Sequence, residues 1–182
     1  MARQENNMKK IGKTIIEKDI ENFDLSKERE TVRAVIFNDE KICMLYSGLY
    51  DDYTFPGGGL KEGESHLDAL KRELKEELGA NLVKIIKPIG FTEEIRYGLN
   101  KNESIYKQTS YYYLCEVSQL SEPIFIGREK EQLLKFTCLS LNEAISQNEI
   151  TNSKRNIENH KGFTTVLRRE NLILKYLKEK II

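Results

Sequence analysis

The sequence predicts an α/β fold, and three of its stretches carry that prediction. Residues 31–46 hold two β-branched and aliphatic runs separated by Asn38 and Asp39, which is the pattern of a β-hairpin. Residues 65–78 place leucines at helical spacing, and the apolar residues of 164–180 do the same. Strand-rich segments combined with two amphipathic helices are typical of a sheet that carries helices on its faces.

The other predicted elements are five short strand-like runs and a short helix at 141–147. The hairpin strands alternate imperfectly between apolar and polar residues, which suits a sheet covered on both faces. Pro88 interrupts one of the runs, and we expect the run at 104–117 to be the longest strand. The five runs are 14–16, 53–55, 81–92, 104–117 and 134–139.

A chain of 182 residues is long enough to bury the core of one domain. We predict that residues 1–30 are an N-terminal extension, in which 14–16 is an edge strand. Residues 31–182 then form a single domain that includes the C-terminal amphipathic helix. The apolar face of that helix is expected to pack on its own domain rather than to form a dimer seam.

Charge and composition argue against several classes of function. Lys and Arg number 29, as do Asp and Glu, so neither a basic field for nucleic acid nor a polybasic membrane patch is predicted. The first ten residues lack an apolar region and no run approaches 18 apolar residues, so we expect neither a signal peptide nor a membrane span. Cys43, Cys115 and Cys138 lack metal-type spacing and are expected to be reduced thiols of a cytoplasmic protein.

The stretch from Gly57 to Ala80 combines a glycine-rich loop with a helix that carries three carboxylates. Ser65, with an acidic residue three positions later, favours a helix start, and Gly79 favours its end. The leucines share one stripe, so Glu73, Glu76 and Glu77 project together from its flank. Like charges at this spacing repel one another, and a divalent cation among them would relieve that repulsion. Taken alone, these residues favour an ordinary surface helix. The wider pattern reverses that preference.

That wider pattern resembles the signature of the Nudix (MutT-like) hydrolase family, G-x5-E-x7-R-E-U-x-E-E-x-G-U, in which U is a bulky aliphatic residue. Seven fixed positions coincide by chance on the order of once in 10⁸ starts. Ala80 departs from the pattern, because it is smaller than the usual last aliphatic. The resemblance implies a Nudix α/β/α sandwich with a mixed β-sheet. The matching residues are Gly58, Glu64, Arg72, Glu73, Leu74, Glu76, Glu77 and Gly79.

The resemblance also implies a metal site. Glu73, Glu76 and Glu77 occupy the family's ligand positions, and the carbonyl of Gly57 is the expected backbone ligand. Oxygen ligands of this kind suit Mg²⁺, with Mn²⁺ as the alternative. Arg72 is expected to orient the carboxylates through ion pairs, and it completes the predicted catalytic set of Arg72, Glu73, Glu76 and Glu77.

Two further box residues and two loop residues have expected roles. Glu64 is expected to tie the loop to the helix, whereas His66 fits no family role and is predicted to lie on the helix surface. The general base is either one of the box glutamates or a residue of a later loop. Glu129 and Glu131 are candidates for that base or for an extra metal ligand, although loop glutamates are more often solvated.

Substrate-binding candidates lie on both sides of the box. Gly58 and Gly59 let the backbone approach a ligand closely. Arg33 and Phe55 are candidates for a base or phosphate pocket, although core packing is favoured for residues on strands. Tyr97 lies 17 residues past the box, where the dinucleoside-polyphosphate subgroup tends to carry a tyrosine. Because the chain contains nine tyrosines, one at this position is only a weak signal.

The predicted function is Mg²⁺-dependent hydrolysis of a phosphoanhydride bond in a nucleoside diphosphate linked to another group. A nucleoside triphosphate, including its oxidised forms, is the favoured substrate. The alternatives are a hydrolase of the dinucleoside-polyphosphate or ADP-ribose type, and a Nudix-type sensor that binds nucleotide without cleaving it. A small nucleotide is the predicted partner, and neither nucleic acid nor a membrane is expected. A homodimer is consistent with the resemblance.

Overall fold

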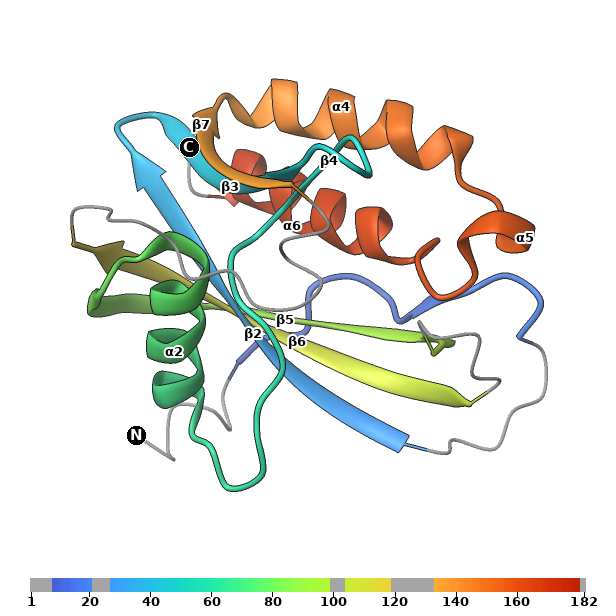
Figure 1. Ribbon diagram of the computed structural model, residues 1–182, viewed down its shortest axis with the longest axis horizontal. Helices are drawn as coiled ribbons and strands as arrows, with labels where there is room; N and C mark the ends of the chain where they lie inside the picture. The colour runs from blue at the N-terminus through green and yellow to red at the C-terminus, as the bar shows by residue number, and fades with distance from the viewer. Residues whose placement is uncertain (1–7, 21–26, 99–103, 119–132, 181–182) are drawn as a thin grey trace.

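The computed structural model describes residues 8–20, 27–98, 104–118 and 133–180, and Figure 1 shows how their elements are arranged. The strands are β1 (Ile15–Ile16), β2 (Lys27–Asn38), β3 (Lys41–Ser47), β4 (Asp52–Thr54), β5 (Leu82–Tyr97), β6 (Ile105–Val117) and β7 (Leu134–Leu139). The helices are α2 (His66–Leu78), α4 (Leu141–Lys154), α5 (Ile157–His160) and α6 (Val166–Lys180).

The strands of the described residues form one mixed sheet. Its order is β1-β5-β6-β2-β3-β4, and β7 also pairs with β3. β2 runs parallel to β6, and β1 runs parallel to β5, whereas the other pairs are antiparallel. The hairpin predicted at 31–46 is the β2–β3 pair, with Asp39 in its turn at a positive φ of 53°.

Both faces of the sheet are buried, as the imperfect alternation of the hairpin strands predicts. Val35, Ile42 and Met44 point to the face covered by α4 and α6. Their sequence neighbours, including Ala34 and Cys43, point to the face covered by α2. Figure 1 shows α2 on one side of the sheet and the α4–α6 pair on the other. The predicted α/β/α sandwich with a mixed sheet is thereby confirmed.

The prediction about the longest strand is wrong. The longest strand is β5, with 16 residues, and not β6, with 13. Pro88 interrupts the regular pairing of β5, with register shifts between Ile85 and Lys87 and between Pro88 and Gly90, but the strand continues past the predicted end at residue 92 to Tyr97. A proline is tolerated in a strand at such irregularities, where its missing N–H breaks no ladder bond.

The C-terminal region contains more helix than the sequence predicts. α4 continues seven residues beyond Gln147, since its second half buries polar rather than apolar side chains. Asn148 faces β4, and the Thr151 hydroxyl donates to the carbonyl of Asp51, just before β4, at 2.6 Å. α6 packs its apolar face, including Leu174 and Leu177, into its own domain as predicted.

Cys43 and Cys138 form a disulfide, so the prediction of reduced thiols is wrong for these two residues. The β3–β7 register places them directly opposite each other, with their Cα atoms 4.0 Å apart. A separation of 95 residues hides this pairing from the sequence. Cys115 is a free buried thiol, and burial raises its pKa to about 12.

The N-terminal segment is tied to β5 by charge as well as by strand pairing. Glu93 accepts from Lys10, from the Thr14 hydroxyl at 3.1 Å and from Lys107 at 2.8 Å. Burial alone would raise the pKa of Glu93, but the two lysines outweigh it and lower that pKa to about 2. Ionised Glu93 therefore stabilises the folded state at neutral pH.

Glu93→Gln is expected to lower the free energy of unfolding by about 1–2 kcal/mol at pH 7. Because the folded pKa lies below the unfolded value of 4.5, this deficit should shrink as the pH falls from about 4.5 toward 2. Urea unfolding at pH 7, 4 and 3 measures it. Glu116→Gln, which removes an exposed pair with Lys84, is the control. An undiminished deficit at pH 3 would contradict the assignment.

Candidate active site

The glycine loop lies against β2. The amides of Val32 and Ala34 donate to the carbonyls of Gly58 and Pro56, at 2.9 and 2.8 Å. Gly57 has a φ of 126°, and a Cβ at this position would overlap the carbonyl oxygen of Val32. Only glycine therefore lets the loop approach β2 this closely.

The box helix begins and ends where the sequence predicts. Ser65 is its N-cap, with its hydroxyl accepting from the Asp68 amide at 3.2 Å. Gly79 ends it in the left-handed conformation, at a φ of 61°. Between these caps, Glu73 and Glu77 are buried beside the loop, whereas Glu76 is partly exposed.

Arg72 connects the loop to the helix. Its Nε and Nη2 donate to the two carboxylate oxygens of Glu64, each at 2.8 Å, and Nη2 also donates to the carbonyl of Gly59 at 3.0 Å. Its Nη1 lies 2.6 Å from Oε1 of Glu73 and 3.4 Å from Oε2 of Glu76. The paired guanidinium lowers the pKa of Glu64 to about 2. Glu64 thus fastens Arg72, which in turn orients the carboxylates.

The donor set suits a hard divalent cation. The carboxylates of Glu73, Glu76 and Glu77 and the carbonyl of Gly57 are all oxygen ligands. A Cβ on Gly58 would overlap the carboxylate of Glu73, so the loop leaves that group accessible only because a glycine stands there. Burial raises the pKa of Glu73, although Arg72 opposes the effect, and a buried carboxylate of this kind favours a neighbouring cation.

The oxygens do not converge in this structure. No group of three or more His, Cys, Asp and Glu side chains with metal-binding geometry occurs in the described part of the chain. Glu73 and Glu76 face Arg72, the carbonyl of Gly57 accepts from Arg33, and Glu77 accepts from the Gly57 amide at 2.7 Å. Guanidinium groups therefore lie against the oxygens that a metal would bind.

A cavity of about 200 Å³ adjoins Glu77. Among its described lining residues, five arginines outnumber the acidic Asp52 and Glu77. The rings of Tyr50 and Phe163 lie 5.5 Å apart at another part of its wall. The arginines come from β2, β5, α6 and the end of α4, and they are Arg29, Arg33, Arg96, Arg155 and Arg169. Such a lining suits a ligand with several negative charges.

Three of these arginines pair with carboxylates, and the other two pair with none in the part of the chain that the structure describes. Arg155 pairs with Asp52, while Arg96 and Arg169 both pair with Glu94. Arg29 and Arg33 form no ion pair with any carboxylate of the described residues. The Nε of Arg33 is buried without a partner there. Burial and the charge of Arg33 lower the pKa of Arg29, as expected for a cation among cations.

The structure brings some predicted binding residues to the cavity and not others. Arg33 lines it, and Gly59 would carry a Cβ only 2.8 Å from Nη2 of Arg29. The side chain of Phe55 is fully buried in the core against Tyr112, so only its backbone reaches the loop. Tyr97 instead donates its hydroxyl to the carbonyl of Asp19 at 3.1 Å.

His66 is not a surface residue, contrary to the prediction. It is 8% exposed, and its Nδ1 lies 2.6 Å from the hydroxyl of Tyr113. Tyr113 points from β6 to the face that α2 covers, which a local reading of the helix does not reveal. The loop candidates Glu129 and Glu131 lie outside the described residues.

Several residues in and beside the cavity were missed by the sequence analysis. Arg29 shares a face of β2 with Arg33, and this period-two spacing is a usable signal. Arg169 and Glu170 lie between Val166 and Ile173 on the apolar stripe of α6, where charged residues are rarely placed without a partner. That position was the signal for a buried ionic network.

Comparison with known proteins identifies the family. A model of the NUDIX domain matches residues 27–160, which is most of the chain. The chain belongs to the Nudix family. It is therefore a Nudix hydrolase, and divalent metals are general in this family.

Curated relatives and a solved structure agree with this assignment. The chain is 31% identical over 134 residues to nucleoside triphosphatase NudI of Enterobacter sp. (strain 638), covering 69% of this Nudix chain and 92% of the relative. It is 32% identical over 140 residues to an RNA pyrophosphohydrolase of Sulfurovum sp. (strain NBC37-1), covering 71% and 87%. A Nudix hydrolase structure from Nitrosomonas europaea shares the fold, with a TM-score of 0.53 at 20% identity over 85% and 91% of the chains.

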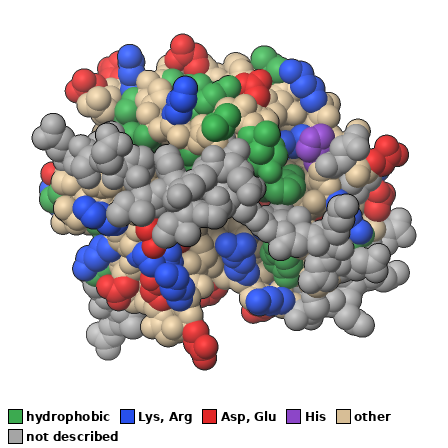
Figure 2. All heavy atoms as spheres, viewed as in Figure 1, with side chains coloured by type: hydrophobic (Ala, Val, Ile, Leu, Met, Phe, Trp, Pro, Cys, Tyr) green, Lys and Arg blue, Asp and Glu red, His purple; other side chains and the backbone are tan. Residues whose placement is uncertain are grey.

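The surface and the helices add two observations about this Nudix hydrolase. Figure 2 shows Lys and Arg side chains interspersed with Asp and Glu over the described part of one face. None of the helices in the described ranges combines the length and apolar character that crossing a membrane requires.

Proposed function

We propose that the protein is a Mg²⁺-dependent pyrophosphohydrolase that cleaves a phosphoanhydride bond of a nucleoside triphosphate. The observation that carries this proposal is the cavity beside Glu77, which is also lined by Arg29 and Arg33, two arginines that pair with no carboxylate of the described residues. Cations for a phosphate chain then lie beside one of the carboxylates proposed to bind the metal. The relative named as a nucleoside triphosphatase gives further support.

The proposed roles follow from these positions. Glu73, Glu76, Glu77 and the Gly57 carbonyl hold Mg²⁺ or Mn²⁺, which neutralises charge on the phosphates and activates water. Arg72 holds the carboxylates of Glu73 and Glu76 in place by donating hydrogen bonds to both. One box glutamate, or Glu129 or Glu131, is the proposed general base.

Arg29 and Arg33 are the proposed phosphate-binding pair. Both lie on β2 and line the cavity, and the guanidinium of Arg33 already donates to the carbonyl of Phe55 at 3.1 Å. The Nε of Arg33 is buried without a hydrogen-bond partner among the described residues. Gly59 lets the backbone come close to Arg29, and Gly58 does the same for Glu73.

Arg29→Gln is expected to raise the KM for a nucleoside triphosphate about ten- to a hundredfold and to change kcat less than threefold. The reason is the loss of one charge-assisted phosphate contact, worth about 1.5–3 kcal/mol. Inhibition by inorganic triphosphate should weaken by a similar factor. The control is Arg168→Gln, since Arg168 is exposed and donates to the carbonyl of Ile16. An unchanged KM would remove Arg29 from the site.

A substrate panel tests the proposal. Purified protein is incubated with nucleoside triphosphates and their oxidised forms, ADP-ribose, dinucleoside polyphosphates and a 5′-triphosphorylated RNA oligonucleotide, with Mg²⁺ or with chelator. We expect metal-dependent release of pyrophosphate that is fastest on a nucleoside triphosphate. Tight nucleotide binding without turnover on any compound would favour the sensor alternative.

Removal of pyrophosphate from RNA is the second candidate function. The observation that favours it is the set of relatives named RNA pyrophosphohydrolase. Both candidates require recognition of a 5′-triphosphate, so the cavity serves either. The balanced charge of the chain favours the small substrate, because a basic track for a polynucleotide is not predicted from the composition. Faster turnover of the RNA oligonucleotide would reverse this preference.

The extent of the catalytic unit is part of the proposal. The sequence predicts its boundary at residue 31, with 1–30 as an extension, but we place the start of the unit at residue 27, because β2 begins there and Arg29 lines the cavity. The unit runs to residue 182, although the family model covers 27–160. α6 lies beyond that end, yet Val166 and Arg169 line the cavity. A cytoplasmic location and a homodimer remain predictions.

A further inference from the structure

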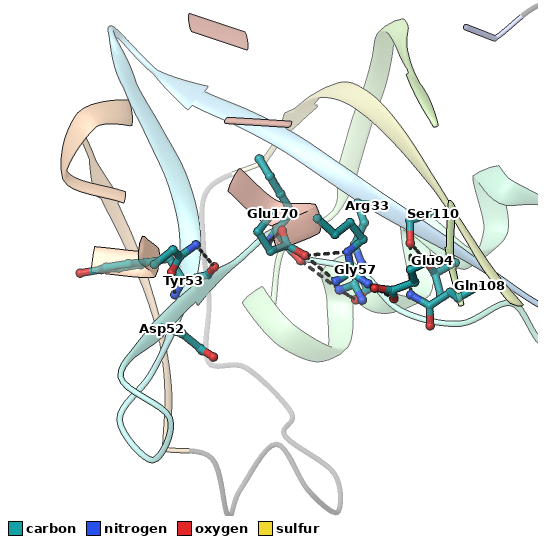
Figure 3. Close-up of polar contacts among 12 residues, drawn as sticks. Arg33, Asp52, Tyr53, Gly57, Glu94, Gln108, Ser110 and Glu170 are labelled. Atoms are coloured by element: carbon teal, nitrogen blue, oxygen red, sulfur yellow. Dashed lines mark hydrogen bonds and ion pairs between the residues drawn. The ribbon is translucent and has the colours of Figure 1, made fainter. Parts of the chain in front are cut away.

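Helix α6 reaches the glycine loop through a fully buried carboxylate. Oε2 of Glu170 accepts a hydrogen bond from the amide of Phe55 at 3.1 Å. Two residues later, Gly57 carries the carbonyl assigned above to the metal. Figure 3 shows Glu170, from α6, and Arg33, from β2, beside Gly57. A side chain beyond the family-model match therefore holds the start of the loop.

The contact belongs to a clamp along the outer edge of β4. Tyr53 is bonded by the side chain of Asn148 on α4, which accepts from its amide at 2.8 Å and donates to its carbonyl at 2.9 Å. Glu170 accepts from the amide of Phe55, which lies two residues after Tyr53 and points in the same direction. Two helices thus satisfy the edge of a strand that would otherwise leave its amides unpaired. Asn148 fixes the strand, and Glu170 fixes its exit into the loop.

Glu170 is itself held in one orientation. Its Oε1 accepts from Nη2 of Arg169 at 2.5 Å, and Nη1 of Arg169 donates to Glu94 at 2.7 Å. Burial opposes ionisation of Glu94, but Arg169 and Arg96 outweigh it and hold the pKa of Glu94 below its usual value. With Arg169 shared between two carboxylates, the Oε2 of Glu170 remains directed at Phe55.

The backbone that Glu170 holds is continuous with the oxygens of the proposed metal site. The Phe55 carbonyl and the Gly57 carbonyl both accept from Nη1 of Arg33. The Gly57 amide donates to Oε2 of Glu77. A shift of Phe55 would therefore move the Gly57 carbonyl, and with it the hydrogen bond that orients Glu77.

We propose that Glu170 is a positioning residue for the metal site, acting through its hydrogen bond to the Phe55 amide. This inference rests on the proposed function, because it concerns the same oxygens. The competing view is that Glu170 only neutralises Arg169 and stabilises the fold. The two views differ in which property of the side chain counts, its reach or its charge.

Two conservative variants separate reach from charge. Glu170→Asp keeps the charge beside Arg169 but withdraws the carboxylate from Phe55 by one methylene. Glu170→Gln keeps an oxygen at the same reach but loses the charge. Affinity for Mn²⁺ is measured by isothermal titration calorimetry without substrate, and kcat is measured at saturating metal, both per folded molecule. Positioning predicts that Glu170→Asp weakens Mn²⁺ binding at least tenfold and that Glu170→Gln weakens it less than threefold.

Asn148→Ala is the matched control, because it breaks the same clamp two residues earlier. It should lower the Tm while leaving Mn²⁺ affinity within twofold of the wild type. The proposal is overturned if Glu170→Asp binds Mn²⁺ within threefold of the wild type, or if Glu170→Gln is weakened as much as Glu170→Asp. If wild-type protein binds Mn²⁺ but cleaves nothing, the proposed function fails while the binding comparison still decides the role of Glu170.

Discussion

Glu77→Gln is expected to lower kcat about a thousandfold while leaving the protein folded, which corresponds to about 4 kcal/mol in the activation barrier. The glutamine oxygen can still accept from the Gly57 amide, which Glu77 binds at 2.7 Å, so the loop keeps its anchor. The negative charge that the proposed metal requires is lost. Steady-state kinetics with a nucleoside triphosphate and Mg²⁺ measure the effect.

The control for this variant is Glu149→Gln, the same chemical change on an exposed residue of α4 that pairs with Lys175. It should leave kcat unchanged. Near-ultraviolet circular dichroism should show both variants folded. A Glu77→Gln protein with more than a tenth of wild-type kcat would remove Glu77 from the catalytic set.

Gly57→Ala is expected to be the most damaging single substitution in the loop. Its Cβ would overlap the backbone carbonyl of Val32, and a φ of 126° is unfavourable for any residue with a Cβ. We expect a loss of about 3 kcal/mol in the free energy of unfolding, since the atoms that this Cβ would meet belong to the backbone of Val32 and Arg33 and cannot move aside as a side chain can. Displacement of the Gly57 carbonyl should lower kcat at least about a hundredfold. Urea unfolding and steady-state kinetics measure the two effects.

Gly63→Ala separates the clash from the backbone strain. Gly63 also has a positive φ, of 72°, but a Cβ there would meet no atom within 4 Å. It should cost about 1 kcal/mol and leave kcat within twofold. Equal losses in stability and activity for the two variants would show that the close approach of Gly57 to β2 does not matter.

Much of the fold was predictable because its signals are local. Ser65 and Gly79 bound α2, and the β2–β3 hairpin follows from its two apolar runs and turn residues. Features that depend on distant partners were missed. The polar half of α4 makes sense only against the edge of β4, and the Cys43–Cys138 pair requires the β3–β7 register.

The candidate site divides in the same way. The box residues lie on one helix and one loop, so their spacing alone brings Arg72 to Glu73 and Glu76. The cavity instead collects arginines from four separate elements, and only Arg33 among them was a candidate from sequence. Phe55 shows the opposite case, because the sequence favours core packing for strand residues and its ring is fully buried in the core.

The most direct test of the account is a time course of nucleoside triphosphate turnover followed by ³¹P nuclear magnetic resonance, in Mg²⁺ and after chelation, with wild-type protein and Glu77→Gln. We predict that wild-type protein with Mg²⁺ converts the triphosphate to a nucleoside monophosphate and pyrophosphate. Chelator or Glu77→Gln should leave the triphosphate resonances in place. Turnover that persists in chelator, or that is equally fast in Glu77→Gln, would contradict a metal site built on the box glutamates.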